Sequence, residues 1–182
     1  DLDDCGGSYD PVEGVSDTEI KIGQSVPRSG PAATFALLTQ GMRGYFDYAN
    51  AELDGVNGRK ITLIDKDDGY EPARTAQNVD ELLNEGIVAT SGILGTPQNL
   101  AVRDTLNAEC VPHLFPSTGA PDWGDAEEYP RTVGGAVIPY NVEARIWAEY
   151  LQEQYPDGAN VVALAMDNEF GDAYQTWLDH YL

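Results

Sequence analysis

The chain has few basic side chains and no long apolar run. Only 10 of its 182 residues are lysine or arginine, against 31 aspartates and glutamates, so the formal net charge is −21. An acidic chain of this kind repels phosphate backbones and anionic lipid surfaces, and we therefore expect no nucleic acid partner. No stretch approaches the roughly 18 apolar residues that a membrane-spanning helix needs. We interpret the acidity as solubility in a salty or extracellular setting.

Motifs for catalysis and metal binding are also missing. GxSxG, HExxH, Walker A and CxxC patterns do not occur. The two histidines, His113 and His180, have no matching acid or cysteine pattern, so we expect surface or packing roles for them. Asp65, Asp67 and Asp68 offer clustered oxygen ligands for a cation, but without EF-hand spacing, and a solvated strand end is the preferred interpretation. We expect no catalytic residue, no metal and no cofactor.

What is present is a regular alternation of strand and helix patterns. A hydrophobic content of 42% is enough for a core. β-branched apolar runs predict strands at residues 20–26, 60–66, 87–94 and 111–115, and apolar spacings of three and four predict helices at 35–53, 72–83 and 98–108. The buried face of the first helix is expected to consist of Phe35, Leu38, Met42, Phe46, Ala49 and Leu53. This order indicates the α/β class, a parallel sheet with helices on both faces.

A second, shorter unit follows an irregular stretch at residues 120–135. Its pattern predicts a helix at 140–154, a strand at 159–166 and a last helix up to residue 182. We therefore divide the chain into a tail (1–17), a first lobe (18–132) and a partial second lobe (133–182). Three elements bury too little surface to be stable alone, so this piece must pack on the first lobe or on another copy of the chain.

Four loops follow the predicted parallel strands, at residues 25–34, 67–70, 95–98 and 116–120. The carboxyl ends of parallel strands lie at one edge of the sheet, where backbone N–H groups and helix N-termini hold anionic groups of ligands. The loops therefore predict a shared ligand cleft. The alternative is that they are only turns between strands and helices.

Three segments resemble the branched-chain amino acid (Leu/Ile/Val-type) periplasmic binding proteins, which are substrate-binding subunits of ABC importers. They are TEIKIGQSVPRSGPAA at 18–33, YPRT at 129–132 and DNEFG at 167–171. The resemblance implies a type I periplasmic binding protein lobe plus a fragment of the second lobe. It implies binding of an amino acid or related small carboxylate, delivery to an ABC transporter permease, and a periplasmic or cell-surface location. A ligand-sensing receptor ectodomain with the same fold is the alternative.

The resemblance also implies roles for particular residues. Thr96 stands where the family has a hydroxyl that holds the ligand's α-carboxylate, and Phe35 lies near a family aromatic that covers the ligand. Phe170 matches an aromatic that packs on the ligand from across the cleft. The full expected ligand-binding set is Arg28, Phe35, Thr96, Pro97, Ser117, Thr118, Gly119, Ala120, Asn168 and Phe170. For Thr96 and Thr118, helix N-capping is the alternative role.

The chain departs from the family in the second lobe, of which it carries one piece. In the family, the acidic residue that binds the ligand's ammonium group lies in a later part. We therefore expect the chain by itself to bind solute weakly or not at all.

Two cysteines, Cys5 and Cys110, are separated by more than half of the chain. In the extracytoplasmic location that the resemblance implies, they are expected to form a disulfide. Cys110 precedes the fourth strand, and the tail with Cys5 leads to the start of the first strand, at the same end of a parallel sheet. The alternatives are a lipid-modified Cys5 in a lipoprotein and a buried free Cys110. Residues 1–4 are acidic and unlike a lipobox, and we expect the sequence to be a mature or trimmed form without its signal peptide.

Overall fold

A single parallel sheet organises the amino-terminal part of the chain. The computed structural model describes Cys5, Asp10 and residues 12–182. Five strands pair in the order β2-β1-β3-β4-β5, and every pairing is parallel. They are β1 (Glu19–Val26), β2 (Lys60–Asp67), β3 (Ala89–Ser91), β4 (His113–Leu114) and β5 (Thr132–Val133). The parallel sheet that the alternating pattern predicts is confirmed.

The short strand β5 is missing from the sequence prediction. It has two residues and lies in the stretch that was expected to be irregular. The backbone N–H groups of His113 and Phe115 donate to the carbonyls of Arg131 and Val133, so β5 completes the edge of the sheet. Val133 is thus part of the first sheet, although the predicted lobe boundary places it in the second lobe. The division into lobes itself stays a prediction.

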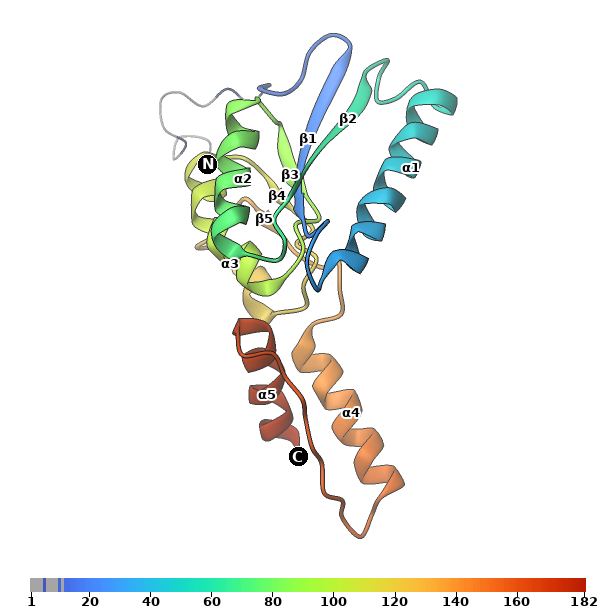
Figure 1. Ribbon diagram of the computed structural model, residues 1–182, viewed down its shortest axis with the longest axis vertical. Helices are drawn as coiled ribbons and strands as arrows, with labels where there is room; N and C mark the ends of the chain where they lie inside the picture. The colour runs from blue at the N-terminus through green and yellow to red at the C-terminus, as the bar shows by residue number, and fades with distance from the viewer. Residues whose placement is uncertain (1–4, 6–9, 11) are drawn as a thin grey trace.

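Helices cover both faces of the sheet (Figure 1). Helices α2 (Pro72–Asn84) and α3 (Thr96–Ala108) lie on one face, and α1 (Ala36–Glu52) lies on the other. A fully buried cluster beneath α2 and α3 forms the core: Val79, Ile93, Val102 and Leu106. Pro72 begins α2, where a missing N–H loses no helical hydrogen bond, and Gly86 ends it at φ 67°.

The apolar face predicted for α1 is largely exposed, which corrects the sequence analysis. Phe35, Leu38 and Leu53 are each more than half exposed, and Ala49 is the one buried member of the predicted face. Figure 1 shows the reason: α1 diverges from the sheet along its length, and β2 is the strand that it contacts. Amphipathic spacing identified the helix correctly but did not determine what covers its apolar side.

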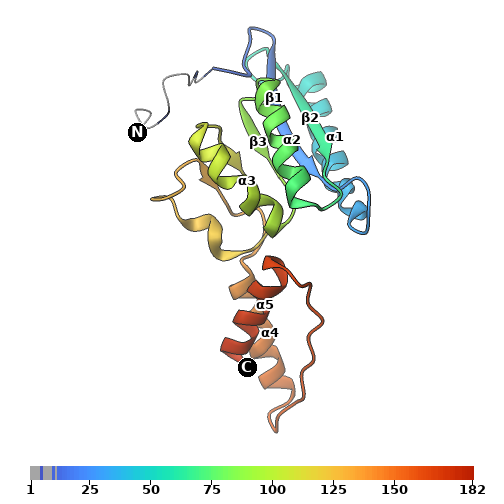
Figure 2. The same cartoon turned by 60° about the vertical axis from the view of Figure 1, so that its left-hand side comes forward.

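The carboxyl-terminal part projects from the carboxyl ends of the strands (Figures 1 and 2). It contains α4 (Tyr140–Gln154) and α5 (Glu169–Tyr181), which lie side by side. The rings of Tyr140 and Tyr174 stack between them with centroids 4.5 Å apart. Leu100 of α3 packs against the same cluster, so this piece packs on the first lobe, one of the two expected arrangements. Association with another copy stays a prediction.

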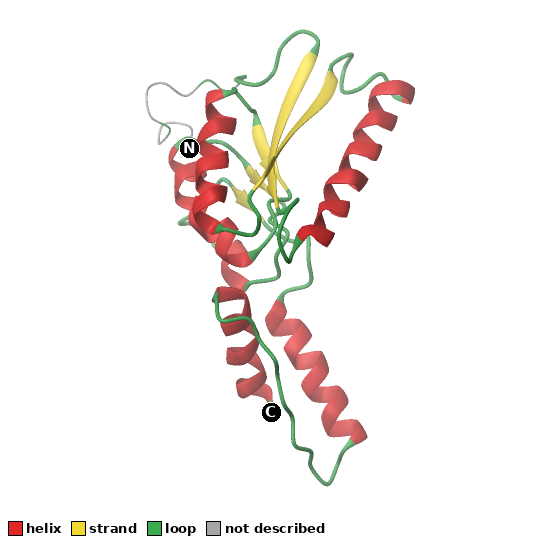
Figure 3. Ribbon diagram, viewed as in Figure 1, coloured by secondary structure: helices red, strands yellow, loops and turns green. Residues whose placement is uncertain are grey.

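The strand predicted at residues 159–166 is wrong. Figure 3 shows this segment as a loop that returns along α5, and no strand is assigned there. Val162 is 93% exposed and Leu164 is fully exposed. A strand needs a neighbour for its backbone N–H and C=O groups. The described residues place no strand beside this segment, so it forms no strand hydrogen bonds in spite of its β-branched sequence.

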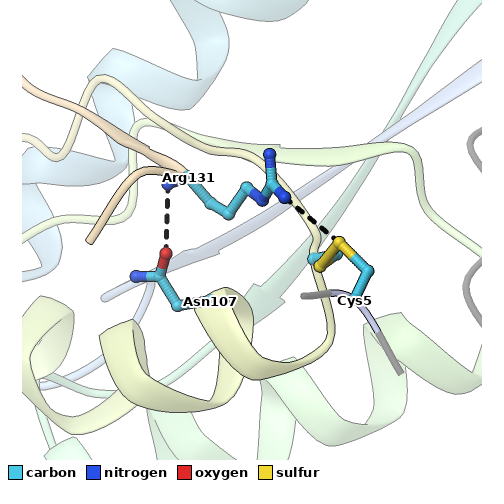
Figure 4. Close-up of a disulfide and its surroundings, with 4 residues drawn as sticks. Cys5, Asn107 and Arg131 are labelled. Carbon is cyan, nitrogen blue, oxygen red and sulfur yellow. Dashed lines mark hydrogen bonds between the residues drawn. A yellow bond between two sulfur atoms is a disulfide. The ribbon is translucent and has the colours of Figure 1, made fainter. Parts of the chain in front are cut away.

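Cys5 and Cys110 are joined in a disulfide, with their Cα atoms 5.6 Å apart (Figure 4). Both side chains are buried. An Arg131 guanidinium nitrogen donates to the Cys5 sulfur at 3.1 Å, and the Arg131 backbone N–H donates to Asn107 Oδ1 at 3.0 Å. The disulfide therefore fastens the tail to the connection between α3 and β4, and the Arg131 hydrogen bond links it to the stretch that leads into β5. Because the Cys5 sulfur is part of this disulfide, it is not available for the lipid modification that was the alternative.

Among the residues that the structure describes, no helix combines the length and the apolar character needed to cross a membrane.

Candidate functional site

A cavity of about 430 Å³ lies at the carboxyl ends of the strands. All four predicted loops contribute to its wall, as expected from a parallel sheet. Its other wall comes from the carboxyl-terminal part. The lining residues are Pro31, Ala32, Phe35, Gly69, Tyr70, Glu71, Leu94, Gly95, Ser117, Tyr140, Met166 and Phe170. The cavity is therefore built jointly by the sheet end and by the segments that begin α4 and α5.

Five of the ten predicted site residues line this cavity or a neighbouring one. Phe35, Ser117 and Phe170 belong to the cavity itself. Pro97 and Asn168 line an adjoining cavity of about 450 Å³ between the N-termini of α3 and α5. Tyr70 lines both cavities.

Thr96 and Thr118 lie behind the wall rather than on it. Both are almost fully buried, and their hydroxyl oxygens are 2.6 Å apart in a hydrogen bond. Thr96 does not cap α3, because the N-cap is Gly95 and no side chain caps the helix. Thr118 accepts a hydrogen bond from the Ala120 backbone N–H at 3.2 Å, which stabilises the local turn but caps no helix. The expectation that both hydroxyls hold a carboxylate stays a prediction.

Gly119 and Ala120 support the aromatic wall instead of lining the cavity. The Gly119 carbonyl accepts a hydrogen bond from the Tyr140 backbone N–H at 2.6 Å. A side chain at Gly119 would collide with the Ile138 carbonyl and the Tyr140 ring. Ala120 packs with Trp123 and Tyr140 in a buried cluster. This loop therefore fixes the position of Tyr140.

Arg28 does not line either cavity. Its guanidinium pairs with Asp65 at 2.9 Å, and Arg43 of α1 pairs with the same carboxylate. The side chain of Asp65 is only 4% exposed, so the prediction of solvated strand-end acids is wrong for this residue. Asp68 is also fully buried. Its carboxylate accepts hydrogen bonds from the hydroxyls of Ser25 and Thr75, at 2.7 and 3.2 Å.

Asp67 organises the loop that follows β1. Its carboxylate accepts hydrogen bonds from the backbone N–H groups of Arg28, Ser29 and Gly69 and from the Ser29 hydroxyl, at 2.6–3.1 Å. Burial alone would raise the pKa of Asp67, but these donors outweigh it and lower the pKa to about 2. All three aspartates are thus held by donors or cations of the protein, and the described residues contain no group of three metal-ligating side chains.

The substitution Asp67→Asn is expected to lower the free energy of unfolding by about 1 kcal/mol, because Ser29 loses its charged acceptor. Amide hydrogen exchange at Arg28 and Ser29 should become faster. The contribution is present above the ordinary pKa of 3.8 and is lost as the pH falls through about 2. The exposed Asp47→Asn on α1 is the control. Unchanged exchange at both amides would contradict the loop-holding role.

Tyr70 is a wall residue that the predicted site set omits. It has a left-handed backbone at φ 68°, which a non-glycine residue keeps only when its surroundings hold it. The Asp68 carboxylate accepts from its N–H at 2.9 Å, and Gln98 Nε2 donates to its carbonyl at 2.7 Å. Burial raises the pKa of its hydroxyl. The sequence signal was its place in the strand-end loop at 67–70.

Tyr140 and Met166 are also absent from the predicted set, because both lie in stretches interpreted only as secondary structure. The Tyr140 ring meets the Phe170 ring edge to face, with centroids 5.4 Å apart. The DNEFG segment arranges this contact. Asn168 caps α5 by accepting from the N–H groups of Phe170 and Gly171, at 3.1 and 3.3 Å. Gly171 lies directly against the Met166 carbonyl, where no Cβ would fit.

Comparison with known proteins agrees with this geometry. Residues 19–182 match the family model described as periplasmic binding protein. A Leu/Ile/Val-binding protein homolog 3 from Brucella melitensis is 28% identical over 105 residues, which cover 57% of this chain and 28% of that protein.

Solved structures share the fold. A possible leucine/isoleucine/valine-binding protein from Rhodopirellula baltica superposes with a TM-score of 0.80 at 25% identity, over 96% of this chain and 46% of that one. A branched-chain amino acid transporter substrate binding protein from Streptococcus pneumoniae, in complex with isoleucine, gives 0.77 at 22% identity, over 90% and 47%. The chain therefore spans less than half the length of the proteins that it matches.

Proposed function

The chain belongs to the periplasmic binding protein family, a family of binding proteins and not of enzymes, and from this premise we propose that it binds a small solute outside the cytoplasm. The proposed solute is an amino acid or related small carboxylate, for delivery to the permease of an ABC importer. The observation that supports this function best is the cavity, which the strand ends and the carboxyl-terminal part enclose together.

The chemistry of the wall suits a zwitterion. Gly95, the N-cap of α3, lines the cavity. The N–H groups in the first turn of a helix have no acceptor within the helix, and the helix dipole adds positive potential there. A solute carboxylate at this end of α3 would receive those hydrogen bonds, and the aromatic rings of the opposite wall would cover an apolar side chain.

Binding in such a cavity couples naturally to motion between its two walls. Phe170 and Tyr140 come from the carboxyl-terminal part, while the strand-end loops come from the sheet. A solute that contacts both walls stabilises the arrangement in which they are close, which is lobe closure about the connection at residues 134–139.

Titration of the isotope-labelled chain with a panel of L-amino acids tests the function. We expect at least one amino acid to shift the amide resonances of Gly95, Ser117 and Phe170. The affinity should be far weaker than a Kd of about 1 μM, or −8.2 kcal/mol, because part of the family's second lobe is not present. If neither an amino acid nor a related small carboxylate moves these resonances, even at the highest solute concentration, the proposed function is wrong. A Kd at or below about 1 μM would instead contradict the expected weakness.

A further inference from the structure

The cations nearest the strand ends are already paired with aspartates. Arg28 and Arg43 share the buried carboxylate of Asp65. Arg74 lies 3.7 Å from the Asp67 carboxylate and donates to the Asp67 carbonyl at 3.2 Å. No lysine, arginine or histidine lines either cavity in the described part of the chain. A purely anionic solute would therefore find no side-chain counter-ion here.

The charged residues that line the two cavities are glutamates instead. Glu71 lines the main cavity, and Glu169 lines the adjoining cavity across Tyr70. Glu71 is the N-cap residue of α2, yet its side chain makes no capping hydrogen bond, and no ion pair of its carboxylate is found among the described residues. The carboxylate is thus free to meet a positive group of a solute. The overall charge of −21 favours the approach of such a solute as well.

Aromatic rings form much of the remaining wall. Phe35 comes from the loop after β1, Tyr70 from the loop after β2, and Tyr140 and Phe170 from the carboxyl-terminal part. Faces of aromatic rings attract cations through the ring quadrupole, and ammonium groups are recognised in this way. The cavity therefore presents rings and one carboxylate to its ligand, and no positive side chain.

We infer that this cavity selects solutes that carry an ammonium group and discriminates against carboxylates that lack one. Glu71 is the counter-ion and the rings of Phe35 and Tyr70 flank the ammonium, while the rings of Tyr140 and Phe170 cover the apolar side chain. This inference deepens the proposed function and rests on it, because it assigns the ammonium recognition to residues of this chain. The carboxylate of an amino acid, where present, goes to the N-terminus of α3.

Three probes that share one branched carbon skeleton test the selection: L-leucine, 3-methylbutylamine and 4-methylpentanoate. The last two lack the carboxylate and the ammonium group, respectively. Binding to the chain is measured by chemical shift changes of Gly95 and Phe170 across a concentration series. We expect L-leucine and the amine to bind, and 4-methylpentanoate to bind at least about tenfold more weakly than L-leucine, a difference of about 1.4 kcal/mol.

Two variants assign the effect to residues. Glu71→Gln is expected to weaken the amine about threefold, a size typical of an exposed ion pair, and to leave 4-methylpentanoate unchanged or slightly tighter. Phe35→Leu removes a half-exposed ring and should also weaken the amine about threefold. The matched controls are Glu153→Gln on α4 and Tyr45→Leu on α1, both exposed and outside the cavities. Neither control should change any affinity.

The outcomes separate the inference from the proposed function. If 4-methylpentanoate binds as tightly as L-leucine, or if Glu71→Gln weakens all three probes equally, the ammonium selection is wrong while solute binding stands. If none of the three probes and none of the amino acids binds, the proposed function fails and the inference fails with it. Binding of L-leucine and the amine alone, reduced in both variants, supports the inference.

Discussion

Reduction of the Cys5–Cys110 disulfide is expected to lower the free energy of unfolding by about 4–5 kcal/mol. The two cysteines are 105 residues apart in the sequence, and the chain-entropy model gives this value for a loop of about a hundred residues. The effect arises in the unfolded chain, which gains conformations when the link is removed. It is a large part of the stability of an ordinary domain, so reduced protein should unfold at much lower urea concentration.

The measurement compares urea unfolding of the oxidised chain with that of the same chain in reductant, so that no buried side chain is exchanged. A Cys5→Ser, Cys110→Ser double variant gives a second estimate and should not respond to reductant. Free thiols are counted in denatured, unreduced protein from an oxidising export route. Two free thiols per chain there would show that the bond does not form, and an unchanged urea midpoint after reduction would contradict its stabilising role.

Acidification from neutral pH to about pH 4 is expected to remove about 3 kcal/mol of stability through His113 alone. This ring is fully buried in β4, where its Nε2 lies 2.7 Å from Asn99 Oδ1. The Asn99 amide nitrogen donates to the carbonyls of Ile93 and Gly95, so its oxygen is the acceptor and the neutral ring carries its proton on Nε2. The other ring nitrogen has no hydrogen-bond partner among the residues that the structure describes.

Burial, and to a smaller degree the positive charge of Arg103, lowers the pKa of His113 from its ordinary 6.5 to about 4. In the unfolded chain the ring takes up a proton as the pH falls through 6.5, while the native ring stays neutral until about pH 4. The unfolded state therefore binds more protons in this window, and stability falls with falling pH there. Below about pH 4 this group causes no further loss.

The variant His113→Gln, which keeps a donor for Asn99, should show a correspondingly smaller loss of stability between pH 6.5 and 4. Because that variant loses some packing against Trp123, the shape of the pH profile is the readout rather than the absolute stability. The ring resonances of His113 in the parent protein give an independent check. A titration midpoint near 6.5 would show that the ring is not buried in the neutral form and would overturn the prediction.

Local sequence patterns were sufficient for most of the first lobe. Helix α2 begins at Pro72 and ends before Gly86, where the chemistry of proline and glycine predicts it. β1 and β2 coincide with their apolar runs, and the parallel order follows from the alternation of strands and helices. The convergence of the strand-end loops on one cavity was predictable too, because it follows from the parallel direction alone.

The identity of the wall residues depended on distant partners. Arg28 was a reasonable candidate for a ligand contact by its place in the loop, but it pairs with the carboxylate of Asp65 of β2, which also pairs with Arg43, and it does not line the cavity. Thr96 and Thr118 come from two loops, and each hydroxyl is used by the other. Conversely, Tyr140 starts a helix far along the chain and reaches the cavity because that helix docks below the strands.

The sequence by itself determined the elements with strong local signals and the edge of the sheet at which a cavity forms, because capping, turn chemistry and apolar periodicity act over a few residues. The tertiary structure alone decided which surfaces find partners. The same apolar, β-branched character that makes β1 a paired strand leaves residues 159–166 unpaired and exposed, since no neighbouring strand offers hydrogen bonds. Pairing and burial each depend on two segments that contact one another. The sequence of one segment carries no information about the segment that will lie beside it.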